Sequence, residues 1–115
     1  MIVDERTYTI APGLLSEYLA EHLRVALPIM RKHLGEPFAY FTTETGELNQ
    51  FVHLWRYENM ADRETRREAL YRDADWLDYR RSTGERGWVR HQHNRLLKSL
   101  AGAPTALAEG RHDAR

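Results

Sequence analysis

The chain has 115 residues, with 17 Lys and Arg against 17 Asp and Glu, and it contains no cysteine. This length predicts one domain with a thin core, which a second copy of the chain would help to complete. Zero net charge argues against a nucleic-acid or anionic-membrane partner. The lack of cysteine excludes disulfides, a thiolate nucleophile and cysteine-ligated zinc or iron–sulfur centres.

Neither a leader nor a membrane span is expected. Acidic residues follow within Met1–Arg6, where a signal peptide would carry a basic and then an apolar segment. The longest apolar run, Val25–Met30, is interrupted by Pro28 and is much too short to cross a bilayer. A soluble cytoplasmic protein is therefore predicted.

The first third of the chain predicts one strand and one long helix. Ile2–Ile10 alternates and is rich in β-branched residues, which favours a strand. Apolar residues then recur at helical spacing from Leu14 to Leu34. Pro28 predicts a kink or a break in that helix, because it lacks a backbone donor and crowds the preceding turn.

The rest of the chain, after Leu34, predicts a hairpin, a helical region and a last strand. Strand-like runs at Phe38–Glu44 and Asn49–Tyr57 flank a four-residue connection that contains a glycine. Asn59 is placed to cap a helix over Met60–Tyr71, and Asp73 to cap a second helical segment. The residues from 88 to 97 read as a final strand. A domain over residues 1–98 and a flexible tail over 99–115 are expected.

This order of elements, β-α-β-β-α-β, predicts an α+β ferredoxin-like fold with a four-stranded antiparallel sheet and its helices on one face. Side chains alternate across a strand, so the third strand has an aromatic face and an aliphatic face. The aliphatic face, with Val52 and Leu54, is expected under the helices. The aromatic face, joined by Tyr40 opposite His53, is expected to be open and consists of Phe51, His53, Trp55 and Tyr57.

Such an aromatic face is larger than a monomer normally exposes. A homodimer that packs sheet against sheet would cover it. A lumen left between the two sheets would then have the apolar character, with a few convergent polar groups, of a small-molecule site.

Four separated segments resemble the NIPSNAP family over roughly residues 2–98, and they are Ile2–Gly13, Tyr40–Gln50, Val52–Tyr57 and Gln92–Leu97. The resemblance implies the dimeric α/β-barrel superfamily, in which two ferredoxin-like protomers form one barrel. Similar barrels include cofactor-independent monooxygenases of antibiotic biosynthesis, muconolactone isomerases and haem-binding enzymes. A shared fold does not transfer a reaction, so the chemistry must be argued from the residues.

His53 is the sharpest catalytic candidate, since an imidazole on an aromatic face is suited to general-base work near neutral pH. The alternative is a hydrogen-bonded histidine in the dimer interface. Arg6 is suited to stabilising an anion, assisted by Tyr8. The alternative for Arg6 is a buried ion pair, either with Asp4 or with an acidic residue of the second chain. The residues predicted to bind a ligand in the lumen are Asp4, Tyr40, Phe51, Trp55, Tyr57, Gln92 and Asn94.

Other patterns give weaker signals. His91 and His93 share one side of a strand, but no third ligand at a suitable spacing completes a metal site. The mixed charges between Asp62 and Arg81 are typical of a solvated helix surface.

The leading hypothesis is a homodimeric protein of bacterial small-molecule metabolism that binds an aromatic or polyketide-like compound without a cofactor or metal. Proton transfer, as in isomerisation or cyclisation, or oxygenation of a phenol would be its reaction. The alternative is a non-catalytic interaction or stress-associated protein whose barrel is only a dimer core. Haem binding is a third hypothesis.

Overall fold

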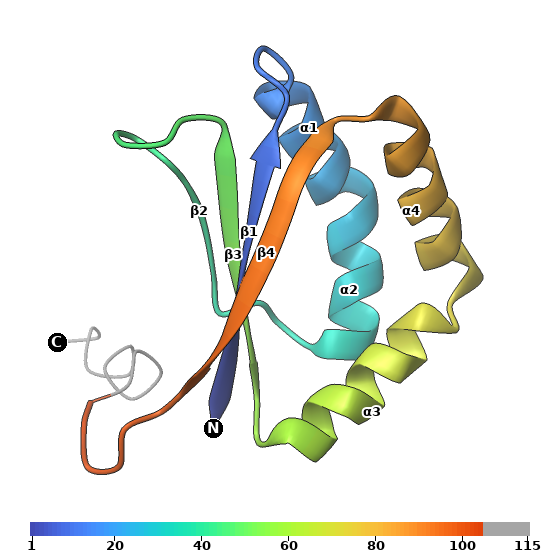
Figure 1. Ribbon diagram of the computed structural model, residues 1–115. Coiled ribbons are helices and arrows are strands. Elements are labelled where there is room, and N and C mark those ends of the chain that lie inside the picture. The colour runs from blue at the N-terminus through green and yellow to red at the C-terminus, as the bar shows by residue number, and fades with distance from the viewer. Residues whose placement is uncertain (105–115) are drawn as a thin grey trace, which may run out of the picture.

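The computed structural model describes residues 1–104 and contains one four-stranded sheet with helices on one of its faces (Figure 1). Its elements, in chain order, are β1 (Ile2–Ile10), α1 (Leu15–Glu21), the π-helical segment η1 (His22–Ala26), α2 (Leu27–Leu34), β2 (Ala39–Thr42), β3 (Gln50–Tyr57), α3 (Met60–Tyr71), α4 (Ala74–Arg86) and β4 (Val89–Lys98). Most of the predicted tail lies in residues 105–115, outside the described residues.

The strands lie in the order β2-β3-β1-β4 and all pair antiparallel, which confirms the predicted ferredoxin-like topology. The predicted pairing of Tyr40 with His53 is also confirmed. On the central strand, Arg6 lies between His53 of β3 and Asn94 of β4. This register brings residues from three separate segments to one place on the sheet.

The predicted choice of faces is wrong, because the helices cover the aromatic face of β3. Phe51, His53, Trp55 and Tyr57 are at most 2% exposed, whereas the residues between them are only half-buried. Aromatic side chains bury more apolar area than valine or leucine, so this choice buries the larger surface under the helices. The sheet's open face therefore has the aliphatic residues, including Val52 and Leu54.

The first helical region is interrupted before Pro28. Leu27 donates its backbone N–H to the carbonyl of His22, five residues earlier, and Pro28 lies in the first turn of α2. Proline cannot donate to a carbonyl four residues back, and the wider π turn accommodates this defect. Buried His22 is the first residue of this irregular segment.

The later helices begin where their caps predict. Asn59 accepts a hydrogen bond from the backbone of Asp62 at 2.8 Å, and Asp73 accepts one from that of Asp75 at 2.9 Å. Gly87, with a φ of 65°, ends α4 in the left-handed conformation that suits glycine. No helix within residues 1–104 is long and apolar enough to cross a bilayer.

Candidate functional site

A cavity of about 220 Å³ lies between the sheet and the helices of a single chain. β1 contributes Arg6 and Tyr8, and the edge strand β4 contributes Val89 and Gln92. The helical layer contributes the larger part of the lining, namely Tyr18, His22, Met30, Arg67, Tyr71, Trp76, Tyr79, Arg80, Thr83 and Gly84, with Gly87 at the end of α4. The cavity is therefore not the predicted lumen between two sheets.

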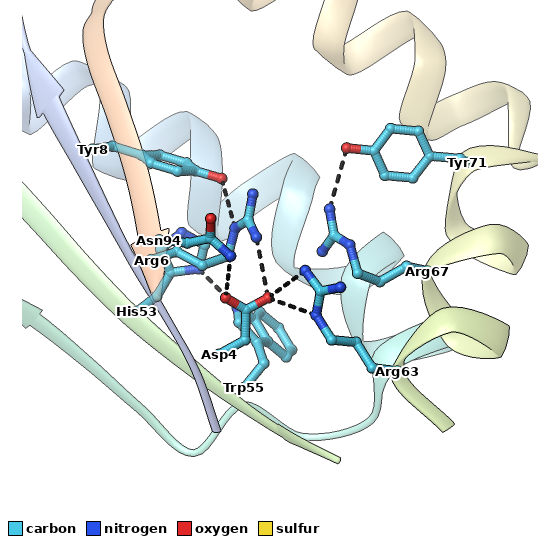
Figure 2. A network of polar contacts seen from close by, with 9 residues as sticks. All are labelled: Asp4, Arg6, Tyr8, His53, Trp55, Arg63, Arg67, Tyr71 and Asn94. Carbon is cyan, nitrogen blue, oxygen red and sulfur yellow. Dashed lines mark hydrogen bonds and ion pairs between the residues drawn. The ribbon is translucent and has the colours of Figure 1, made fainter. Parts of the chain in front are cut away.

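A buried carboxylate lies beside this cavity and pairs with Arg6, one of the arginines that line it (Figure 2). Asp4 is fully buried and accepts hydrogen bonds from Arg6 at 3.1 Å, Arg63 at 3.2 and 3.3 Å, and Asn94 at 2.9 Å. Burying a carboxylate is costly unless it is paired, and these donors supply that pairing. The alternative interpretation of Arg6, an ion pair with Asp4, is present in the structure.

Arg6 remains charged in this setting and also contacts Tyr8. Burial opposes its charge, but Tyr8 and Asp4 outweigh that effect and hold the pKa of Arg6 above its ordinary value. Its Nε donates to the Tyr8 hydroxyl at 3.3 Å, so the hydroxyl hydrogen of Tyr8 is free to donate elsewhere. Arg6 and Tyr8 thus present positive charge and a hydrogen-bond donor to the cavity.

The geometry of His53 argues against its predicted role as a general base. Trp55 donates its indole N–H to His53 Nδ1 at 2.8 Å, and an indole can only donate. The proton of the neutral imidazole must therefore be on Nε2, which leaves no free lone pair. His53 also does not line the cavity, so it would not reach a ligand there. Burial, with the neighbouring His22, lowers the pKa of His53 well below its usual value, so its imidazole is neutral.

His22 is a second buried imidazole, and this one lines the cavity. Its ring lies 5.5 Å from that of His53, and its Nε2 is 2.8 Å from the hydroxyl of Tyr40. Burial lowers the pKa of His22 to about 4, so its imidazole is neutral at neutral pH. When Nε2 carries the proton and donates to Tyr40, Nδ1 presents a free lone pair.

Three buried polar atoms on cavity-lining residues have no hydrogen-bond partner within residues 1–104: His22 Nδ1, Trp76 Nε1 and the Tyr79 hydroxyl oxygen. Burial raises the pKa of Tyr79 to about 12, so its phenol is neutral and able to donate. Buried polar groups without partners are uncommon in folded proteins. Two further such atoms, His53 Nε2 and the Tyr57 hydroxyl oxygen, belong to the packed layer, so three of the five in residues 1–104 lie at this cavity. That grouping indicates a place where a polar small molecule or water completes the bonding.

The predicted site residues divide into three groups. Arg6, Tyr8 and Gln92 line the cavity, whereas Asp4 and Asn94 support Arg6 from beside it. The remaining residues belong to the packed layer under the helices, and they are Tyr40, Phe51, His53, Trp55 and Tyr57.

Sequence reasoning missed the helical half of the site. His22 follows Tyr18 by four residues and so lies on the apolar side of its helix, a spacing that signals burial. Arg63 and Arg67 share a helix face with buried Leu70 in the same way, and the expected solvated surface is wrong for these two residues, because Arg63 pairs with buried Asp4 and Arg67 lines the cavity. Helical spacing was the available signal for all three.

His91 and His93 lie on the sheet's open face, with ring centres 5.7 Å apart. Within residues 1–104 no group of three or more metal-ligating side chains is assembled. The structure thus brings no third ligand to this pair.

The fold of this chain defines its structural class. A proposed antibiotic biosynthesis monooxygenase from Nitrosomonas europaea has the same fold, with a TM-score of 0.62 over 87% of this chain and 99% of that one, at 16% identity. The protein is thus an α+β protein of this ferredoxin-like fold. The NIPSNAP family model matches residues 3–104, and the chain belongs to the NIPSNAP family.

Relatives agree with this assignment. An uncharacterised NIPSNAP-like domain protein from Burkholderia xenovorans is 35% identical, with a TM-score of 0.81 over 90% of this chain and 89% of that one. Protein NipSnap of Drosophila melanogaster is 31% identical over 104 residues, which is 90% of this chain and 37% of that protein. NipSnap homolog 3B of mouse is 35% identical over 64% of this chain and 29% of its own length. The chain thus spans only about a third of these curated relatives.

Proposed function

We propose that this NIPSNAP-family protein binds a single-ring aromatic compound in the cavity between its sheet and its helices. The observation that carries the proposal is the convergence of Arg6, Tyr8 and three unpartnered polar atoms on one cavity. Its volume of about 220 Å³ is below the range of about 300–1,000 Å³ that suits drug-sized ligands. This size favours a compound with a single ring over a larger polyketide-like compound.

Within this cavity we propose a cofactor-independent proton transfer, with His22 in the role first given to His53. His22 Nδ1 takes a proton from a carbon next to a carbonyl group, and the electron pair of that C–H bond forms a carbon–carbon double bond. The carbonyl oxygen becomes an enolate oxygen, which Tyr8 and the charge of Arg6 stabilise. Return of a proton to carbon completes an exchange or an isomerisation.

The test uses 4-hydroxyacetophenone, a neutral phenol with an enolisable methyl group, and a variant that fills the cavity. Gly84 lies within α4 and lines the cavity, and a Cβ built there meets no atom within 4 Å. Gly84→Phe should therefore fold, gain about 0.5 kcal/mol or less from helix propensity, and lose at least ten-fold in affinity. Calorimetry measures binding, and proton NMR in D₂O measures loss of the methyl signal.

Glu85→Phe is the matched control, because Glu85 is exposed on the same helix and does not line the cavity. This variant should bind and exchange as the wild-type protein does. Equal binding by Gly84→Phe and the wild-type protein would contradict the proposed cavity, and so would a wild-type protein that binds neither this phenol nor its 4-carboxylate and 4-phosphate analogues. Binding without exchange would retain the ligand site and remove the proton transfer.

We also propose that the protein is a homodimer joined through the open face of the sheet. The half-buried Val52 and Leu54 on that face, with Phe41 60% exposed beside them, support it. Leu54→Glu should convert a two-chain mass in sedimentation experiments to a one-chain mass, because a buried carboxylate would have no partner. Leu77→Glu, at an exposed position of α4, should leave the two-chain mass unchanged. A one-chain mass for the wild-type protein would contradict the proposal.

A further inference from the structure

The cavity has an excess of positive charge. Arg6, Arg67 and Arg80 all line it, and among residues 1–104 no cavity-lining residue has a carboxylate. Buried Asp4 already pairs with both Arg6 and Arg63, so it does not balance the remaining guanidinium groups. A neutral aromatic ligand would leave this excess in place.

Arg67 and Arg80 differ in their surroundings from the arginines that form ion pairs. Within residues 1–104 neither one has a carboxylate in ion-pair distance, whereas several arginines on the outer helix surfaces do, namely Arg24, Arg31, Arg66 and Arg81. Other described arginines also lack an ion pair, namely Arg56, Arg72, Arg86 and Arg90, but none of these lines the cavity. Within residues 1–104, an unpaired guanidinium group in the cavity lining is therefore found only at Arg67 and Arg80.

Both guanidinium groups lie against one aromatic ring. The Cζ atoms of Arg67 and Arg80 are 5.4 and 4.9 Å from the ring centre of Tyr71. Figure 2 shows Arg67 with Tyr71, to whose hydroxyl it donates at 3.3 Å. Cation–π contacts orient a guanidinium group while leaving several of its N–H donors unused. Two like charges at one ring repel each other, and an anion near both would relieve that repulsion.

We propose that Arg67 and Arg80, arranged at Tyr71, bind an oxyanion group, a carboxylate or a phosphate, on the single-ring compound that occupies the cavity. The planar guanidinium fork matches the oxygen pairs of both groups. This inference rests on the proposed function and names the substrate class of the same site. The ligand would thus be an aromatic acid or an aryl phosphate rather than a neutral phenol.

A series of three ligands tests this inference, because only the group opposite the ketone changes. The ligands are 4-hydroxyacetophenone, 4-acetylbenzoate and 4-acetylphenyl phosphate, and calorimetry measures their affinities. At least one anion should bind ten-fold or more tightly than the neutral phenol. The better anion shows which oxyanion the site prefers.

The double variant Arg67→Gln with Arg80→Gln should weaken binding of the preferred anion by about 10- to 100-fold, the effect of losing charge-assisted contacts. Its affinity for the neutral phenol should fall by a much smaller factor than its affinity for the anion. Arg81→Gln removes a neighbouring charge outside the cavity and should leave both affinities unchanged.

Two results would overturn the inference while leaving the proposed function intact. In one, the neutral phenol binds as tightly as both anions, and Gly84→Phe still blocks it. In the other, the anions bind more tightly but the double variant retains that preference. If none of the three ligands binds the wild-type protein, the proposed function and this inference both fail.

Discussion

Asp4→Asn is expected to destabilise the protein by about 3–5 kcal/mol, the cost of removing one partner from a buried ion pair. Asp4 is fully buried and accepts hydrogen bonds from two guanidinium groups and one amide. Without its charge, Arg6 and Arg63 remain partly buried beside one another with no compensating anion. Chemical denaturation monitored by tryptophan fluorescence measures the loss.

Asp78→Asn provides the control, because Asp78 pairs with Arg81 but its side chain is 65% exposed. Exposed ion pairs contribute about 0–1 kcal/mol, so this change should be small. Adding Arg63→Met should cost less in the Asp4→Asn protein than in the wild-type protein, since the two groups interact directly. Equal costs for Asp4→Asn and Asp78→Asn would contradict the role given to Asp4.

The second large effect is a loss of stability between pH 7 and pH 5. Burial lowers the pKa of His22 from 6.5 to about 4, so in this range the unfolded chain binds more protons than the folded chain. The free energy of unfolding must therefore fall as the pH falls, by about 2 kcal/mol for His22 alone. His53, whose pKa is lowered in the same direction, adds to this loss.

Denaturation curves at pH 7 and pH 5 measure the effect, and the difference between them is the relevant quantity. His22→Gln should reduce that difference by about 2 kcal/mol, because the variant lacks the titrating group. His93→Gln is the control, because His93 is exposed on the open face. If His22→Gln and the wild-type protein lose the same free energy of unfolding between pH 7 and pH 5, His22 is not held neutral by burial.

The order of the elements and the register of the β2–β3 hairpin could be predicted because both depend on local signals. Asn59 and Asp73 are capping residues followed by helical periodicity, and Tyr40 pairs with His53 because the hairpin is nearly symmetrical about its turn. The position of the π turn could not be predicted in the same way. Pro28 indicates only that a hydrogen bond is missing, and neighbouring contacts decide how the helix adjusts.

The face of the sheet under the helices depends on contacts that sequence alternation does not contain. Alternation separates Trp55 from Leu54 but is symmetrical between the two sides. Which face the helices cover depends on the side chains that the helices present to the sheet. Here α3 places Arg63 beside Asp4. Arg63 lies 59 residues from Asp4 in the sequence. Without this partner in view, the sequence favours an open face for the Asp4 carboxylate.

Because the helices cover the aromatic face of β3, the candidate site is a cavity within one chain and not a lumen between two chains. Amide chemical shifts of the labelled protein, titrated with 4-hydroxyacetophenone, test this claim most directly. Gly84, Gly87 and Val89, which line the cavity, should show the largest changes, and Thr7 and Val52 on the open face should show little change. Changes confined to the open face, or no changes at saturating ligand, would contradict the account.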